Sequence, residues 1–517
     1  MIGDPTKYPK SYKTVVHMLH DAAVKFPSSI ALVYKKRKLN YQDYFQYVMG
    51  FSKNLKSMAN LQSLKGHRVA VICNNSMDMA ISLFAVHAAG AQVVPINPIY
   101  TTREITFILV DSDPTIVIFD QTIEEIVAPI IDRLKIRYFI KVDGEDNMLP
   151  NTWRDKEDAD IYSILEPEDL ATLQYTGGTT GSPKGVNITH GQLSINITQR
   201  EASWPTIEGQ EKILCVMPLF HVFATSMALY LSAFSKGQMH IMNKYHPELV
   251  LRAIENNGIT LLPVGPSIFH NLMNCEIFNT IDFSTLRIAY SGSAPLPDVT
   301  LQRWENETGC IILEGYGQTE AGPLVSANVE GSEIIVGSVG KALMDTEIEI
   351  IDVETGEKIL DIKEKGEIRV KGPQIMSGYR NNQAETDEAL RNGWLYTGDI
   401  GEFDEAGNLF IRDRKKDMVI TGGYNVYPRE IEEILYRHPD ILEAAVIGIA
   451  DEYRGQVLHG FVTITRRSEI NSAEILNYCR VDLAEYKIPK RIFIVDQIPR
   501  TIIGKIDKKA IKERSCG

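Results

Sequence analysis

The stretch Tyr175-Thr-Gly-Gly-Thr-Thr-Gly-Ser-Pro-Lys184-Gly185 holds four glycines, four aliphatic hydroxyls and one lysine in eleven residues. Glycines permit left-handed backbone angles and let neighbouring amide N–H groups converge in a turn. Strand-like residues precede it (Leu173-Gln-Tyr175) and follow it (Val186-Asn-Ile188). Because amides, hydroxyls and a cation between two strands are suited to gripping a polyphosphate, we predict a phosphate-binding loop here.

The loop differs from the Walker phosphate loop, in which a Gly-Lys-Ser/Thr string enters a helix. Ser182 and Pro183 separate Gly181 from Lys184, and Gly185 stands where a hydroxyl that binds Mg²⁺ would be expected. The sequence therefore disfavours the phosphate cradle of an ordinary ATPase or kinase.

Length and composition bound the class of protein. The chain has 517 residues, and because a single hydrophobic core stops growing at roughly 250–300 residues, at least two domains are expected. Apolar residues make up 44% of the chain, charged residues make up 23%, and the net charge is −13. These values are typical of a soluble globular protein and disfavour nucleic acid as a partner.

Cysteine spacing and targeting signals suggest the compartment. The six cysteines form no Cys-x-x-Cys or Cys/His cluster, which disfavours a zinc site or a disulfide framework and favours reduced thiols in the cytoplasm. The N-terminus has no apolar run behind a basic start, so no signal peptide is predicted. The most apolar window, residues 79–96, is broken by His87, Gly90 and Gln92. It predicts a buried helix and a core strand rather than a membrane span.

Strand-like apolar runs alternate with amphipathic helical stretches through most of the chain. The runs include residues 68–73, 92–96, 115–119, 212–216, 259–262 and 287–290, and a helical stretch lies at 247–256. This alternation predicts layered α/β sheets that are buried and largely parallel. From about residue 337 to 378, short alternating strands and turns predict a small antiparallel, β-barrel-like element.

A dense charge run, Arg412-Asp-Arg-Lys-Lys-Asp417, lacks apolar periodicity. The remaining chain after this run has the pattern of a compact α+β unit. We therefore predict an N-terminal domain over residues 1–412 and a C-terminal domain over residues 413–517.

Seven further blocks follow in an order that, with the phosphate loop, resembles adenylate-forming enzymes. This family includes acyl-CoA synthetases, 4-coumarate–CoA ligases, beetle luciferases and peptide-synthetase adenylation domains. The blocks are Pro218-Leu-Phe-His221-Val-Phe, Tyr290-Ser-Gly-Ser-Ala-Pro295-Leu, Glu314-Gly-Tyr-Gly-Gln-Thr-Glu320, Gly393-Trp-Leu-Tyr-Thr-Gly-Asp399, Asp413-Arg414-Lys-Lys416-Asp, Gly422-Gly-Tyr-Asn-Val-Tyr-Pro428 and Pro499-Arg-Thr-Ile-Ile-Gly-Lys505. The resemblance covers nearly the whole chain.

In this family a carboxylate attacks the α-phosphate of MgATP, giving acyl-AMP and pyrophosphate, and a thiol, usually of coenzyme A, then expels AMP. The resemblance implies an acid–thiol ligase that uses ATP, Mg²⁺ and coenzyme A. It also implies a large N-terminal adenylation domain and a small, mobile C-terminal domain. Both half-reactions depend on charge stabilisation more than on acid–base chemistry.

The resemblance also implies how the nucleotide is bound. The phosphate ligands are expected to be Thr176, Gly177, Gly178, Thr179, Thr180, Gly181, Ser182 and Lys184. The adenine and α-phosphate are expected against Ser293, Ala294, Glu314, Gly315, Tyr316, Gly317, Gln318 and Thr319, with the ring of Tyr316 stacked on adenine. Asp399 and Arg414 are expected on the ribose hydroxyls. Glu320, a hard oxygen donor, is expected to bind Mg²⁺ with Thr176.

The catalytic groups implied by the resemblance are Lys505, His221, Thr176 and Lys184. Lys505 would bridge the substrate carboxylate and the α-phosphate, because a positive charge between two converging anions lowers their repulsion. Lys416 would be the hinge of the C-terminal domain. After adenylation, rotation about this hinge would bring Gly422, Gly423 and Tyr424 to the active site, where they would line the coenzyme A tunnel.

The acyl pocket is expected to be lined by residues 220–225, 264–269, 291–294 and 314–315. The small residues Gly292, Ala294 and Gly315 are expected to leave room for a chain or a ring. The block that begins at Glu314 resembles fatty acyl-CoA synthetases more than 4-coumarate–CoA ligases. A medium- or long-chain fatty acid is therefore the first choice of substrate, and an aryl or cinnamate-type acid is the second. A user of fatty acids is compatible with peripheral membrane contact.

Three other classes remain open on the sequence. A free-standing enzyme would load a carrier protein in place of coenzyme A. An oxygenase of the luciferase type would use the same acyl-AMP. A non-catalytic nucleotide-binding homologue is disfavoured by the joint presence of Lys505, Asp399, Arg414 and Glu320.

Overall fold

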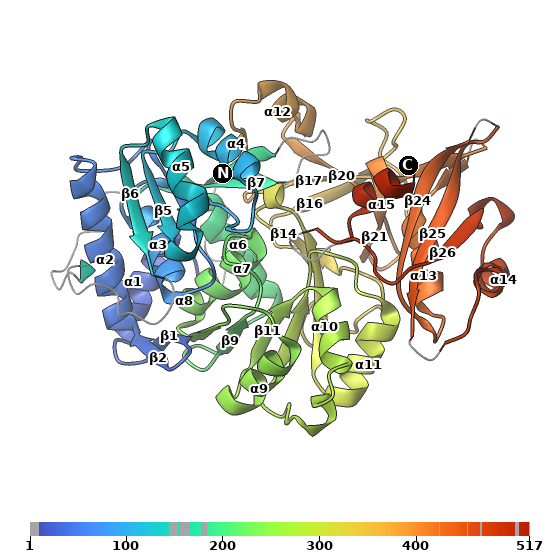
Figure 1. The fold of residues 1–517 in the computed structure, drawn as a ribbon, viewed down its shortest axis with the longest axis horizontal. Helices are drawn as coiled ribbons and strands as arrows, with labels where there is room; N and C mark the ends of the chain where they lie inside the picture. Colours follow the sequence, from blue (N-terminus) through green and yellow to red (C-terminus); the bar gives the residue numbers. More distant parts are fainter. Residues whose placement is uncertain are drawn as a thin grey trace.

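The computed structural model of the chain describes residues 10–143, 153–154, 165–176, 183–422, 424–451, 453–465, 468–501 and 506–515. It is a mixed α/β structure with a large N-terminal part and a small C-terminal part at one end of the molecule (Figure 1). The predicted fold class is therefore confirmed.

The largest sheet has nine strands, of which the six central ones are parallel to their neighbours. Antiparallel partners extend the sheet at both edges. In spatial order its strands are β15 (Lys341–Ala342), β14 (Leu324–Ala327), β13 (Ile311–Gly317), β12 (Ile288–Ser291), β11 (Leu261–Val264), β9 (Lys212–Cys215), β10 (Gln238–Ile241), β1 (Ile30–Tyr34) and β2 (Arg37–Asn40).

A second sheet has seven strands and carries the phosphate loop between β7 and β8. In spatial order its strands are β18 (Gly378–Tyr379), β8 (Lys184–Thr189), β7 (Leu170–Thr176), β4 (Gln92–Pro95), β3 (Arg68–Ile72), β5 (Ile116–Asp120) and β6 (Tyr138–Val142). The strands from β7 to β6 pair in parallel, whereas β8 and β18 are antiparallel additions at one edge.

Helices cover both faces of the two large sheets because the strands are apolar on both faces. In β3, Val69 and Val71 join the central core, whereas Ala70 and Ile72 join an outer core. The helices that contribute to the central core are α1 (Val15–Lys25), α2 (Tyr41–Met58), α3 (Met77–Ala88), α6 (His190–Ser203) and α8 (Leu231–Ser235). Outer helices are α4 (Thr102–Ser112) and α5 (Glu124–Leu134) on one sheet, and α9 (Pro247–Asn257), α10 (Pro266–Met273) and α11 (Asp298–Thr308) on the other. Such layers are typical of strands buried on both faces.

Local sequence signals fix where several helices begin. Thr101 and Thr189 form capping boxes with Glu104 and Gln192 at the starts of α4 and α6. All twelve residues of α3 are buried, which confirms that the most apolar window forms a core helix. None of the helices in the described part of the chain has the length and apolar composition that a bilayer span requires.

The predicted antiparallel element is a five-stranded sheet that extends beyond the predicted range. Its strands are β16 (Glu347–Ile351), β17 (Gly366–Lys371), β20 (Trp394–Phe403), β19 (Leu390–Arg391) and β21 (Leu409–Arg414). The prediction stopped near residue 378, whereas β20 and β21 continue the sheet to Arg414. A helix, α12 (Gln383–Ala389), interrupts the strands and obscured this continuation in the sequence.

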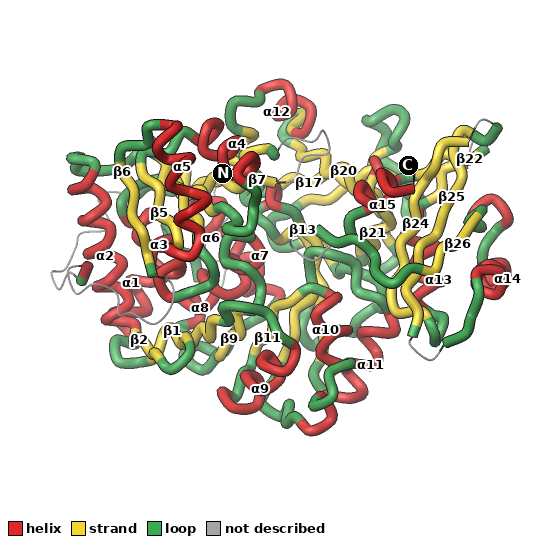
Figure 2. The backbone as a smooth tube through the Cα atoms, viewed as in Figure 1, coloured by secondary structure: helices red, strands yellow, loops and turns green. Residues whose placement is uncertain are grey.

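The C-terminal sheet is a separate mixed sheet of β23 (Tyr424–Val426), β22 (Val419–Thr421), β25 (Gly455–Ile464), β24 (Ile441–Asp451) and β26 (Arg491–Ile494). One of its faces packs on α13 (Pro428–Tyr436) and α14 (Ser472–Asp482), and the other face packs on α15 (Lys508–Ser515). Figure 2 shows its long strands side by side, with α14 on the outside. The predicted domain boundary at residue 413 falls within β21, and it stays a prediction.

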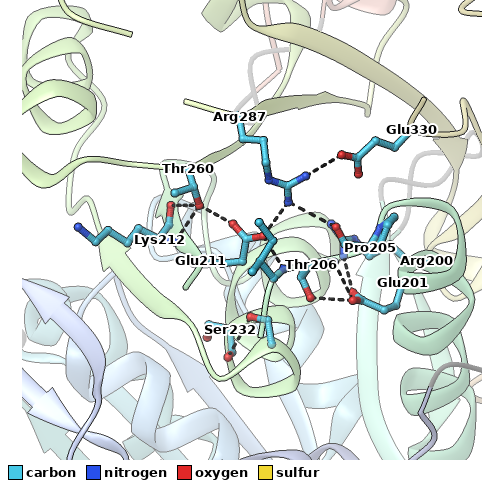
Figure 3. A network of polar contacts seen from close by, with 12 residues as sticks. Arg200, Glu201, Pro205, Thr206, Glu211, Lys212, Ser232, Thr260, Arg287 and Glu330 are labelled. Carbon is cyan, nitrogen blue, oxygen red and sulfur yellow. Dashed lines mark hydrogen bonds and ion pairs between the residues drawn. The ribbon is translucent and has the colours of Figure 1, made fainter. Parts of the chain in front are cut away.

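A buried polar network ties together the amino ends of three neighbouring strands of the nine-stranded sheet (Figure 3). Arg287 donates to Glu211 at 2.6 Å and to Glu330 at 2.8 Å. Thr260 donates to the second oxygen of Glu211 at 2.5 Å. The side chain of Glu211 is only 1% exposed. Its negative charge is therefore compensated by these protein partners and not by water.

Candidate active site

The predicted phosphate loop connects two paired strands. β7 and β8 are antiparallel, and Thr176 at the end of β7 lies opposite Lys184 at the start of β8. The prediction that strands flank this loop is therefore confirmed. Gln174 of β7 donates to the carbonyl of Phe220 at 2.9 Å and links this strand to the segment that leads to His221.

Eight of the predicted site residues lie outside the described residues. They are Gly177, Gly178, Thr179, Thr180, Gly181 and Ser182 of the phosphate loop, Gly423 of the C-terminal part, and Lys505. Their roles stay predictions.

Lys184 is surrounded by residues that the sequence did not single out. Its ammonium group forms a hydrogen-bonded ion pair with Glu385 and lies 5.0 Å from the centre of the Tyr379 ring. The Tyr379 hydroxyl donates to Glu320 at 3.1 Å. Burial, followed by the charge of Glu320, raises the pKa of Tyr379. The structure therefore brings the predicted phosphate ligand and the predicted metal ligand to one place, with Tyr379 between them.

Tyr379 and Glu385 reach this place through tertiary pairing. β18 lies antiparallel to β8, with Gly378 opposite Asn187 and Tyr379 opposite Val186. Because Tyr379 lies 193 positions after its partner Val186 (379 − 186), no local pattern in the sequence could predict the contact.

The carboxyl ends of β12 and β13 bring two predicted blocks together. Ser291 pairs with Glu314, so the turn that holds Ser293 and Ala294 lies beside the start of the Glu314 block. Ser293 has a φ of 71°, in the left-handed region, which turns the chain there. Neighbouring carboxyl ends of parallel strands are the usual binding edge of such sheets.

Glu314 is a buried acid on this edge. Its carboxylate accepts the main-chain N–H of Leu296 at 3.2 Å. Burial raises its pKa to about 7, because the neutral form is favoured where water is excluded. Gly317 ends the strand, and a side chain there would collide with the carbonyl of Pro323, so only glycine fits. The side-chain nitrogen of Gln318 is buried without a hydrogen-bond partner among the described residues.

Tyr316, Asp399 and Arg414 form the most defined cluster of the site. The Tyr316 hydroxyl donates to Asp399 at 2.6 Å, and Nε of Arg414 lies 3.3 Å from the other oxygen of Asp399. Asp399 and Arg414 face each other on β20 and β21. Asp399 is 4% exposed and Tyr316 is 8% exposed. Three residues that the sequence placed on one nucleoside are therefore in direct contact.

The predicted adenine and metal residues adjoin this cluster. Thr319 is buried, and Glu320 follows it in a short 3₁₀ turn, Thr319–Ala321. The carbonyl of Glu320 accepts from Met376, which anchors the turn to the chain that enters β18. The carboxylate of Glu320 fits Mg²⁺, since that ion usually takes one or two protein carboxylates, with substrate phosphates and water as its other ligands.

His221 begins a short helix, α7 (Val222–Ala224). Its Nδ1 accepts the main-chain N–H of Phe223 at 3.2 Å, so a neutral ring carries its proton on Nε2. Asn75 holds the preceding turn, because it accepts from Leu219 at 2.7 Å and donates to Met217 at 3.0 Å. The Phe223 N–H thus orients the ring of His221, and Asn75, from a separate segment, holds the chain that leads to it.

The prediction that Gly292 and Gly315 leave room for an acyl group stays a prediction, and the structure places an aromatic ring beside each of them. A β-carbon on Gly292 would lie 2.9 Å from the ring of Phe223, and one on Gly315 would lie 2.8 Å from the indole of Trp204. Trp204 in turn stacks on Tyr290 at 4.7 Å. Aromatic side chains from distant segments fill the space that the glycines leave.

The predicted hinge and coenzyme A residues follow Arg414 in the chain, and Lys416 lies close enough to interact electrostatically with Arg414 and Asp399. Lys416 lies in a 3₁₀ turn, Lys415–Asp417, between the last strand of the antiparallel sheet and the first strand of the C-terminal sheet. Gly422 has a φ of 57° at the end of β22. Tyr424 is 57% exposed, and its ring stacks at 4.5 Å on Tyr486. The structure therefore groups Tyr424 with the C-terminal part and not with Tyr316 and Asp399.

Comparison with known proteins supports the predicted family. The AMP-binding enzyme family model matches residues 19–380, and the model of the AMP-binding enzyme C-terminal domain matches residues 430–505. A long-chain-fatty-acid–CoA ligase of Bacillus subtilis (strain 168) is 36% identical, and the alignment covers 98% of this chain and 96% of that protein. A long-chain-fatty-acid–CoA ligase of Escherichia coli O6:H1 is 30% identical with the same coverage.

A solved structure supports the same relationship. The crystal structure of ATP-bound MatB from Rhodopseudomonas palustris superposes with a TM-score of 0.89 at 29% identity, covering 96% of this chain and 98% of MatB. The motifs, the fold and the matched length agree, and the chain belongs to the AMP-binding enzyme family, as an adenylate-forming enzyme of the acyl-CoA synthetase group.

Proposed function

We propose that the protein is an AMP-forming fatty acid–CoA ligase. It converts a medium- or long-chain fatty acid and ATP to acyl-AMP and pyrophosphate, and then transfers the acyl group to coenzyme A with release of AMP. The observation that carries the proposal is the contact of Tyr316 and Arg414 with the buried carboxylate of Asp399. This cluster offers an aromatic ring for a base and an oriented acceptor for ribose hydroxyls.

The remaining nucleotide contacts follow from this placement. Thr176 and Lys184 bind the β- and γ-phosphates at the open end of the β7–β8 pair. Gln318 supplies a donor that lacks a protein partner among the described residues. Thr319 donates to the α-phosphate. Glu320, with Thr176, would hold Mg²⁺, which when bound neutralises charge on the phosphate oxygens.

Movement of the C-terminal part, which contains Lys505, switches the enzyme from the first half-reaction to the second. Lys505 is brought to the α-phosphate for adenylation, where its charge offsets the repulsion between carboxylate and phosphate. Rotation at Lys416 then moves Lys505 out of the active site. The same rotation brings in the segment of Gly422, Gly423 and Tyr424, which lines the binding site for coenzyme A. The exposure of Tyr424 supports an assignment of the described conformation to the adenylation half-reaction.

The fatty acid is favoured over an aryl acid by the names of the two bacterial relatives. Phe223 and Trp204 fill the space beside Gly292 and Gly315, so both rings must turn or line the acyl chain when substrate enters. An aryl acid remains the second candidate because stacked aromatic walls also suit a flat ring.

The test is release of pyrophosphate across a panel of straight-chain and aryl carboxylic acids, with and without coenzyme A. We expect the highest kcat/KM with medium- or long-chain acids, and AMP release that depends on coenzyme A. Faster turnover of cinnamate-type acids would show that an aryl acid, and not a fatty acid, is the preferred substrate. Labelling of a carrier protein without any response to coenzyme A would refute the proposed acceptor.

A further inference from the structure

Lys184, the proposed phosphate ligand, is already engaged by a carboxylate. Its ammonium group is paired with Glu385, and the two side chains are 16% and 27% exposed. An ammonium group in such a contact is not a freely solvated cation. Any anion that binds Lys184 must therefore displace the carboxylate or share the ammonium group with it.

Glu385 is held in position by contacts that do not involve Lys184. Its main-chain N–H donates to the side chain of Asn382, which caps α12. Thr386 accepts from the main chain of Tyr379 at 2.9 Å and donates to the carbonyl of Asn382 at 2.8 Å. Because these bonds attach α12 to β18, a neutral side chain at position 385 leaves the helix anchored.

Three carboxylates act on the Tyr379 hydroxyl, whose ring lies beside the Lys184 ammonium group. The carboxylates of Glu320, Glu385 and Glu388 all act on the hydroxyl of Tyr379 and favour its neutral form. A polyphosphate brought to Lys184 would therefore meet a second disadvantage besides competition, which is repulsion from nearby carboxylates.

We propose that Glu385 is a positioning residue that competes with the nucleotide phosphates for Lys184. Its carboxylate stands in for a phosphate oxygen on the ammonium group, since both are anionic acceptors of the same kind of charge-assisted hydrogen bond. ATP displaces it on binding, and it returns to Lys184 when pyrophosphate leaves. The inference rests on the proposed role of Lys184 in holding phosphates.

The direction in which nucleotide affinity changes when Glu385 is neutralised separates this role from a structural one. A competitor weakens nucleotide binding, so its removal tightens binding. A side chain that merely orients Lys184 would strengthen nucleotide binding, so its removal would weaken binding. Glu385→Gln keeps the size and polarity of the side chain and removes the charge.

The experiment is calorimetric titration of MgATP, and separately of inorganic pyrophosphate, onto the full-length protein without any carboxylic acid. We expect Glu385→Gln to lower the Kd for both by about two- to fivefold, the range for a partly exposed ion pair. Asp387→Asn is the matched control, because it removes a carboxylate charge from an exposed position of the same helix. Its Kd should stay close to that of the wild type.

A double-mutant cycle tests whether the effect passes through Lys184. Lys184→Met should raise the Kd for MgATP, and adding Glu385→Gln to it should give less tightening than in the wild-type background. A higher Kd for Glu385→Gln, or equal tightening with and without Lys184, would overturn the proposal. Thermal unfolding of each variant, and Glu385→Ala as a second neutral substitution, exclude a folding effect.

The titration does not require turnover. If the wild type binds MgATP but activates no carboxylic acid, the proposed function fails while the ranking of the variants still decides the role of Glu385.

Discussion

The hydroxyl of Tyr316 donates a 2.6 Å hydrogen bond to Oδ2 of Asp399, across 83 positions of sequence. Tyr316 comes from the nine-stranded sheet and Asp399 from the antiparallel sheet. The bond therefore joins two sheets at the point where the nucleoside is proposed to bind, and it fixes the orientation of a buried carboxylate.

Removal of this carboxylate should weaken nucleotide use. We expect Asp399→Ala to lower kcat/KM for ATP by about 10- to 100-fold, since bonds to charged groups contribute roughly 1.5–3 kcal/mol each. Tyr316→Phe keeps the ring and should cost about tenfold or less. Steady-state kinetics with ATP varied would check both. A larger loss for Tyr316→Phe than for Asp399→Ala would contradict the assignment of Asp399 to the ribose.

Lys505 should matter in one half-reaction only. We expect Lys505→Ala to slow acyl-AMP formation by about 10²–10³-fold, comparable to the removal of one donor to a developing charge. Thioester formation from preformed acyl-AMP should change little, because the lysine has then withdrawn. Pre-steady-state assays measure the rate of each half-reaction separately. Equal losses of rate in both would refute the proposed rotation of the C-terminal part.

The ion pair of Arg287 and Glu211 should support stability rather than chemistry. Arg287→Met leaves the Glu211 carboxylate, which is 1% exposed, without its cation. We expect a loss of about 3–5 kcal/mol in the free energy of unfolding, the range for a broken buried pair. Arg252→Met removes an exposed pair with Glu248 and should cost about 0.5 kcal/mol or less. Urea titration of both variants makes the comparison, and equal costs would contradict the assigned role.

A buried histidine pair should make the protein sensitive to acid. The rings of His87 and His190 lie 5.2 Å apart, and both ring nitrogens of His190 lack a hydrogen-bond partner among the described residues. Burial lowers the pKa of His190 to about 4 and lowers that of His87 as well. The unfolded chain therefore binds more protons than the native protein between about pH 6.5 and pH 4.

It follows that the stabilising contribution of neutral His190 is complete above about pH 6.5 and is lost as the pH falls towards 4. A shift of this size corresponds to about 3 kcal/mol. We expect His190→Gln to flatten the fall in the free energy of unfolding between pH 6.5 and pH 4. Its difference from the wild type at pH 7.5 gives the cost of the substitution itself. Parallel pH curves for the two proteins would disprove the assignment.

Local patterns in the sequence were sufficient to predict several of the strands and helices, whereas most of the candidate site residues came from the resemblance to a family. The apolar run at 68–73 folds as β3, a strand that is buried on both faces and is therefore continuously apolar. The helical stretch at 247–256 folds as α9, which buries one face and therefore repeats its apolar residues with the period of a helix. The Glu314 and Asp399 blocks were placed on one nucleoside through their resemblance to a family. The structure joins the two blocks through the bond from Tyr316 to Asp399, and their role in binding a nucleoside stays a prediction.

Other features depend on chain segments that meet only in the folded protein. Glu385 reaches Lys184 because β18 adds to the edge of a sheet beside β8, where Gly378 pairs with Asn187, 191 positions earlier (378 − 187). Phe223 and Trp204 fill the space beside Gly292 and Gly315, where glycine alone suggested an opening. The sequence by itself determined which residues are chemically suited to bind a nucleotide, because side-chain chemistry and local periodicity are properties of neighbours along the chain. The tertiary structure alone decided which charges face one another and which spaces are filled, because those are set by packing between distant segments.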